Sequence, residues 1–334
     1  MSRVQGALRR AWSLSADPSF CRQSAALSVI ALAVGIVSGG TVRLTGSGLG
    51  CSDWPACTST SVVAPLQFHA WVEFGNRLVN VVITVGIVLV VVAVWRRRPR
   101  RRDLIALSGG LIAGIAAEVV LGGETVLHKL APQFVMAHFL LAVVLLVNAA
   151  ILYHMARQPD TTEGLPPGWA QAVPARRLVR PGHVMASRCM LVLTGVVVAL
   201  GTVVTSTGPH AGAPGVPRFG FSLHAVAQLH GTSVELLLAL TVATLWSMYR
   251  ARVAPAVLRR GEVLLAVLIS QAAVGYAQYL TGDPVLLVGI HITGATAVVL
   301  AMVAFNVGLY EREPPPVVQT VVNERKPAPD LAKI

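Results

Sequence analysis

The chain has 334 residues, of which 54% are hydrophobic and 13% are charged, and its mean hydropathy is +0.66. A soluble domain could not bury so much apolar surface, so this composition is typical of a polytopic membrane protein. The net charge of +12 comes from short basic blocks between apolar runs. Such blocks do not form the basic, aromatic-lined face of a nucleic-acid-binding protein. We therefore expect a lipid bilayer around the chain and no nucleic acid partner.

Apolar runs recur along the chain and predict an all-α membrane protein with eight transmembrane helices. Each run has about the 20 residues that a helix needs to cross a bilayer. The expected spans lie at about 24–45, 70–95, 103–122, 132–155, 186–207, 222–248, 261–280 and 285–310.

Lysine and arginine are distributed unevenly between the two sides of these spans. One side carries 23 of the 27 basic residues, and the other carries only Arg43, Arg77, Lys129 and Arg218. The basic side of a membrane protein usually faces the cytoplasm. The sequence therefore predicts a multi-pass protein of the cell (plasma) membrane with both termini cytoplasmic. We expect the first span to be retained, because no signal-peptide cleavage pattern precedes it.

The chain contains an internal repeat that brings back two histidines. His69 reappears 161 positions later as His230, and His138 reappears 153 positions later as His291. In each half the first of these histidines belongs to the second apolar run and the other to the fourth. The sequence therefore predicts two repeated four-helix bundles.

Segment 118–122 follows the same shift of 153 positions and returns as 271–275. A stretch rich in proline, glycine and charge separates the two halves and has the composition of a surface linker. The last residues have too little apolar surface to fold and are expected to be disordered. The predicted organisation is a cytoplasmic N-terminus (1–23), an N-terminal half (24–155), a cytoplasmic linker (156–185), a C-terminal half (186–310) and a cytoplasmic tail (311–334).

The four repeated histidines are candidate metal ligands. A single imidazole in a membrane helix often only forms a hydrogen bond to a neighbouring helix, but four at matched positions favour ligation. Two helices of a bundle can hold one iron between two imidazoles, and a flat apolar haem fits between helices. Zinc-type Cys/His spacing and the acidic ligands of a di-iron site are missing. We therefore predict haem ligation in each half, by His69 and His138 and by His230 and His291.

The first external loop contains Cys51 and Cys57 within a glycine-rich segment. Outside a bacterial-type membrane the oxidising compartment favours a disulfide over a metal site. A structural staple and a redox role of this bridge are both open.

Glu73 lies near the start of the second span, on the helix face that it shares with His69 and Asn76, and one turn before Arg77. Its simplest interpretation is an ion pair with Arg77. The second half has no acid one turn after His230, however, so this carboxylate belongs to one half alone. Because ionisable groups are costly inside a membrane, we predict a catalytic role for Glu73 on a haem that is chemically changed.

The motifs of segments 39–57, 73–77 and 121–127, followed by His138, resemble those of the haem A synthase family. The resemblance covers about residues 24–310. It implies an oxidoreductase that converts a methyl group of haem O to the formyl group of haem A, through a hydroxymethyl intermediate, for cytochrome oxidase. It also implies that haem O is the substrate and that the first external loop carries a cysteine pair.

The resemblance also assigns roles to the two halves. A haem B is expected in the C-terminal half, held by His230 and His291, and substrate chemistry near Glu73 and His138 in the N-terminal half. One departure concerns Asn76, which stands where the family often has a histidine. The internal repeat favours His69 as the replacement imidazole, with Asn76 and Arg77 supporting the substrate site.

Two other classes of membrane protein compete with this interpretation. A di-haem, cytochrome b-like electron carrier explains the four histidines equally well, but not Glu73 or the Cys51 and Cys57 loop. A transporter built from repeats is less favoured, because helices broken at the membrane centre are not evident. For the synthase we expect haem O synthase and cytochrome oxidase assembly factors as partners, together with an electron-transfer partner that the sequence does not identify.

Overall fold

The computed structural model describes residues 16–312 and contains eight helices that are long and apolar enough to cross a membrane. This confirms the all-α membrane fold. The helices are α2 (Pro18–Leu44), α3 (Phe68–Arg96), α4 (Arg102–Leu127), α5 (Pro132–Ala156), α6 (Pro181–Thr207), α7 (Leu223–Arg250), α8 (Pro255–Leu280) and α9 (Val285–Val307).

Several helices are longer than the apolar runs that predicted them. Helices α2, α6 and α8 each begin at a proline, five or six residues before the expected start of the span. Proline suits the first turn of a helix because its fixed φ is already helical and the missing N–H would have no helical partner there. The added turns of α2 and α8 contain arginines, whose long stems can lie along apolar surface, and that of α6 contains His183, so a span predicted from apolar residues alone starts too late.

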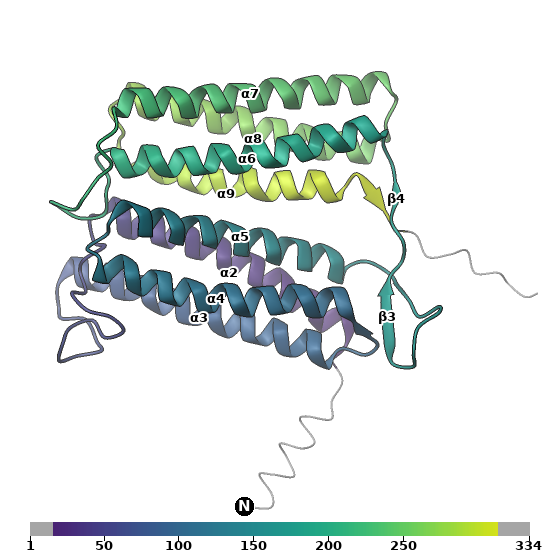
Figure 1. Ribbon diagram of the computed structural model, residues 1–334, viewed down its shortest axis with the longest axis horizontal. Helices are drawn as coiled ribbons and strands as arrows, with labels where there is room; N and C mark the ends of the chain where they lie inside the picture. The colour runs from purple at the N-terminus through teal and green to yellow at the C-terminus, as the bar shows by residue number, and fades with distance from the viewer. Residues whose placement is uncertain (1–15, 313–334) are drawn as a thin grey trace, which may run out of the picture.

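The helices form two four-helix bundles that lie against each other (Figure 1). Helices α2 to α5 make the first bundle and α6 to α9 the second, and matching helix pairs contact each other within both. The bundles meet through their first and fourth helices, because α9 packs on α2 and α5, and α5 also contacts α6. Each bundle has its own apolar core, but Val299 of α9 also belongs to the core of the first bundle. The two bundles are therefore distinct, but the second contributes a residue to the apolar core of the first.

Short strands join the two bundles at the end where α2 begins and α9 ends. Strand β1 (Arg100–Arg101) pairs in parallel with β3 (Trp169–Ala172), which pairs antiparallel with β2 (Asp160–Thr161). Strand β4 (Arg176–Arg177) pairs antiparallel with β5 (Tyr310–Glu311). The expected linker is therefore held to both halves. The expected disordered tail lies, from residue 313 on, outside the described residues, as do residues 1–15 of the expected N-terminus.

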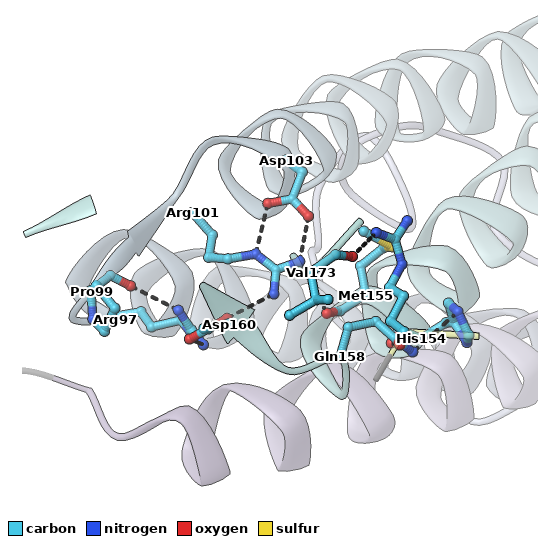
Figure 2. A network of polar contacts seen from close by, with 10 residues as sticks. Arg97, Pro99, Arg101, Asp103, His154, Met155, Gln158, Asp160 and Val173 are labelled. Carbon is cyan, nitrogen blue, oxygen red and sulfur yellow. Dashed lines mark hydrogen bonds and ion pairs between the residues drawn. The ribbon is translucent and has the colours of Figure 1, made fainter. Parts of the chain in front are cut away.

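A buried group of charges fixes this region, as Figure 2 shows. Arg101 is fully buried, and its guanidinium donates hydrogen bonds to Asp103 at 2.9 Å and to Asp160 at 2.9 Å. Arg97 donates to the second oxygen of Asp160 at 2.6 Å. Burial alone would lower the pKa of Arg101, but the two carboxylates raise it above its ordinary value. Arg101 therefore stays charged and ties the linker to the start of α4.

Candidate functional site

The two histidines predicted for the second half face each other in the structure. His230 comes from α7 and His291 from α9, and their ring centres are 6.4 Å apart with an angle of 78° between the ring planes. Two metal–nitrogen bonds of about 2 Å each, added to the distance from nitrogen to ring centre on both sides, span about 6 Å. This spacing fits two axial imidazoles on one iron.

The surroundings of the two rings also fit a haem-type group. Nδ1 of His230 lies 3.1 Å from the carbonyl oxygen of Val197, a contact that directs Nε2 to the other side of the ring. Nδ1 of His291 is buried and has no hydrogen-bond partner among the described residues. Buried polar atoms are rarely left without a partner, so this imidazole is suited to a group that binds the ring.

His138 occupies the corresponding place in the first half. It is the seventh residue of α5, as His291 is the seventh residue of α9. Its Nδ1 lies 2.6 Å from Oε2 of Glu118 on α4, an ion-pair distance, although the two atoms are not aligned as a hydrogen bond. The structure therefore brings a buried carboxylate to the histidine of the first half.

His69 does not lie at the depth of His230. It is the second residue of α3, with an exposed side chain, and its Nδ1 is 2.9 Å from the hydroxyl of Ser47. Asn76 is the ninth residue of α3, whereas His230 is the eighth residue of α7. Since a helix rises about 1.5 Å per residue, His69 is about 10 Å closer than Asn76 to the start of α3. We call the end of the bundles at which α3 starts the outer end. The side-chain oxygen of Asn76 accepts a hydrogen bond from Ser38 at 2.9 Å.

Cys51 and Cys57 form a disulfide, as expected. Both are fully buried in a small cluster with Ala64 and Ala70, and Phe74 packs against it. The loop also reaches α4, because a Cβ placed on Gly123 would meet the ring of Trp54 at 2.9 Å. The disulfide loop is therefore packed against the outer ends of α3 and α4.

Glu73 and Arg77 hold this loop in place. One carboxylate oxygen of Glu73 accepts the backbone N–H of Cys51 at 2.8 Å, and the other accepts from Arg77 at 2.7 Å. Arg77 also donates to three carbonyl oxygens of the loop, those of Asp53, Pro55 and Ala56. Glu73 is 5% exposed, so its charge is buried but paired. The expected ion pair is present, and the loop adds a second partner.

Glu118 was not among the site residues predicted from the sequence. It lies on a different helix from His138 and twenty positions away, so no helical spacing relates them. The available signal was the internal repeat, in which an acid at 118 stands where Gln271 stands in the second half.

Fold and site together define a class: a helical membrane protein of two related bundles with an intramembrane pair of facing histidines. The part of the chain that contains the site also matches a known family. A family described as cytochrome oxidase assembly protein, COX15-CtaA, matches residues 63–303. The chain belongs to this family.

Individual relatives carry the name heme A synthase. The protein from Geobacillus kaustophilus is 34% identical over 105 residues, which cover 31% of this chain and 32% of the relative. The protein from Lysinibacillus sphaericus is 25% identical over 37% of this chain and 42% of the relative. The protein from Shouchella clausii is 24% identical over 83% of this chain and 92% of the relative. The first two alignments thus span less than half of the relatives' length, whereas the third spans nearly all of it.

Proposed function

We propose that this protein is a haem A synthase that oxidises a methyl group of haem O to a formyl group. The reaction removes two hydrogen atoms from the methyl-derived carbon and adds one oxygen atom, through a hydroxymethyl intermediate. The change from methyl to formyl is a four-electron oxidation, so the reaction needs both a source of the oxygen atom and an electron acceptor outside the chain. The proposal rests on one difference between the two halves. The second half has two histidines that face each other, whereas at the corresponding place the first half has a histidine beside a buried carboxylate. The family and the names of the relatives support it.

In this proposal the second half holds a resident haem B between His230 and His291. The spacing of 6.4 Å between the rings supports this, as does the unpartnered Nδ1 of His291. A bound haem would supply one-electron transfer. His230 and His291 would hold the group in place and would keep other ligands away from its iron.

The first half would then receive haem O as the substrate, with His138 as an axial ligand. The distance from the start of the helix favours Asn76 over His69 as the counterpart of His230. Asn76 is the ninth residue of α3 and His230 the eighth residue of α7, whereas His69 is only the second residue of α3. In this arrangement His69 anchors the outer end of the site through Ser47. Glu73 and Arg77 keep the disulfide loop over the same end and limit the access of water.

The orientation and partners belong to the same proposal. The excess of basic residues supports cytoplasmic termini in the cell membrane, with the disulfide loop outside. Haem O synthase would supply the substrate, and assembly factors of cytochrome oxidase would receive haem A.

Pigment analysis separates the synthase from a di-haem electron carrier. Haem extracted from the purified protein is expected to contain haem B together with haem O or haem A. Haem B alone, at two molecules per chain, would favour the carrier. The inequality of the two halves argues against the carrier, because a carrier has no need of a site that exchanges its haem.

Replacement of His230 or His291 by alanine tests the resident site. Each variant is expected to lose the low-spin b-type absorbance of the purified protein, because one axial ligand is removed. His224→Ala is the matched control, since this exposed histidine lies on the same helix as His230 and contacts Tyr279 instead. Full retention of the b-type spectrum in both His230→Ala and His291→Ala would overturn the assignment.

A further inference from the structure

Glu118 is a buried acid that has no role in the reaction as proposed above. Glu118 is 9% exposed, and its Oε2 lies 2.6 Å from Nδ1 of His138. Its other oxygen, Oε1, is buried without a hydrogen-bond partner among the described residues. A buried carboxylate costs several kcal/mol to desolvate unless it is paired. The contact with His138 is therefore the feature that needs an explanation.

The repeat provides an internal comparison for this contact. Gln271 is the counterpart of Glu118, and its amide nitrogen donates to the backbone oxygen of His291 at 2.6 Å instead of meeting the ring. The backs of the two rings are otherwise held alike. A Cβ on Gly122 would lie 3.3 Å from Cε1 of His138, and one on Gly275 would lie 3.1 Å from Cε1 of His291. Neither Nδ1 has an aligned hydrogen bond among the described residues, but that of His138 has a carboxylate oxygen at 2.6 Å, whereas that of His291 has none at ion-pair distance.

A carboxylate at Nδ1 determines which nitrogen of the ring is free. A carboxylate oxygen 2.6 Å from Nδ1 attracts the positive end of an N–H group, which favours the ring proton on Nδ1 and leaves the lone pair on Nε2. Acids that contact a ligating histidine in this way fix the ring orientation and make the ligand more basic. We propose that Glu118 is a positioning residue that holds His138 in the Nδ1–H tautomer and strengthens its bond to the iron of the substrate haem.

This inference rests on the proposed function, because it takes His138 as the ligand of haem O. It adds a difference between the two halves. The first half presents an electron-rich imidazole to its haem, whereas in the part of the chain that the structure describes Nδ1 of His230 meets a neutral carbonyl and Nδ1 of His291 has no hydrogen-bond partner. The iron in the first half is therefore held at a lower reduction potential than an equivalent site with glutamine would give.

Titration of haem O into purified protein that already contains its resident haem tests this directly. The added haem is followed by its iron–histidine stretching band in the ferrous state, its reduction potential and its dissociation constant. Glu118→Gln is expected to shift the band to lower frequency and raise the potential. Haem O binding should weaken by about 10-fold or more, as for other partners of metal-ligating histidines.

Glu124→Gln is the matched control, since it makes the same change on α4 at an exposed acid that contacts the exposed His128. It should alter none of the three quantities. Gln271→Glu provides the reverse test, because a carboxylate beside His291 should lower the potential of the resident haem. A retained resident-haem spectrum shows that each variant is folded.

His138→Ala separates failure of the inference from failure of the proposed function. This variant should abolish the spectrum of the added haem. If it does so while Glu118→Gln and Gln271→Glu leave band and potential unchanged, the role of Glu118 is wrong and the function stands. If His138→Ala binds haem O with an unaltered spectrum, the substrate site itself is placed wrongly and the inference falls with it.

Discussion

Glu73 holds the disulfide loop in place and is also predicted to take part in the reaction, and the sequence alone cannot separate these two roles. The structure gives both of its oxygens a donor, Cys51 on one side and Arg77 on the other. A carboxylate so engaged is a scaffold for the disulfide loop, whatever else it does. Its chemical role then depends on how the loop shapes the outer end of the first-half site.

Glu73→Gln should leave the b-type spectrum of the resident haem intact and abolish formation of haem A. The amide can accept from only one of the two donors, which costs about 1–3 kcal/mol for a buried group that loses its partner. The expected result is accumulation of haem O or its hydroxymethyl product, measured by chromatography of extracted haems.

Glu163→Gln changes an exposed acid of the linker between the halves, serves as the control and should behave like the unaltered protein. Normal haem A production by Glu73→Gln would show that the charge at this position is not needed for conversion. The reaction would then have to be explained by His138 and its surroundings alone.

The repeat identified the histidines, but it could not fix their depth. The pairing of His69 with His230 rests on the similar sequence around both residues. In the structure His69 is the second residue of its helix, whereas His230 is the eighth. Helix α7 begins after Ser222, whose hydroxyl accepts a backbone N–H, whereas α3 begins after Gln67 without such a cap. Where a helix starts is decided by local capping and loop packing, so residues that match in sequence can lie two turns apart.

At the scale of elements, hydropathy predicted all eight spans but none of the strands. Strands β1, β2, β4 and β5 have two residues each, too few for an alternating pattern to appear. They form because basic loops and the linker meet at one end of the bundles. Their positions depend on the packing of helices that are distant in sequence, which no local pattern contains.

The packing of the disulfide loop on α3 depends on one glycine. A Cβ on Gly50 would lie 2.1 Å from the carbonyl oxygen of His69, far closer than any real contact. Gly50→Ala should therefore force the loop away from the helix and lower the free energy of unfolding by about 1–3 kcal/mol. The melting temperature and the rate at which reductant opens the disulfide measure the effect.

Gly109→Ala on α4 is the comparison, because a Cβ there would meet nothing within 4 Å. Alanine in an open helical position should be neutral or stabilising by about 0.5–1 kcal/mol. Equal melting temperatures and reduction rates for Gly50→Ala and the unaltered protein would mean that the loop does not rest on α3.

At the scale of the whole molecule, Arg43 joins the outer ends of the two bundles. Its guanidinium donates to the carbonyl oxygens of Thr205 at 2.8 Å and His210 at 2.6 Å, both in the second half. A backbone hydrogen bond of 2.9 Å from Gly48 to Gly212 lies nearby. His210 in turn lies 2.8 Å from the carbonyl oxygen of Asp283, so three outer segments are connected.

Arg43→Ala should weaken the connection between the halves. Two carbonyl groups lose their donor, at a cost of about 1–3 kcal/mol. Thermal release of the resident haem should begin at a lower temperature, followed by its absorbance. Arg218→Ala removes an exposed arginine that, among the described residues, donates a hydrogen bond to the carbonyl oxygen of Pro209, and it should have little effect. Identical release curves for Arg43→Ala and Arg218→Ala would contradict a role in joining the halves.

The short strands at the ends of the bundles imply an order in which the parts of the fold can form during synthesis. Strand β1 precedes its partner β3 by about seventy positions, and both are made before α6 emerges. The first bundle and its sheet can therefore close while the second bundle is still untranslated, as N-terminal units generally do. Strand β5 follows the last helix and meets β4, which was made before the whole second bundle. The contacts that tie the end of the second bundle to the linker are therefore made last. A nascent chain stopped at residue 307 would contain all eight described membrane helices but would lack both β5 and the carbonyl of Leu309 that accepts from Leu178.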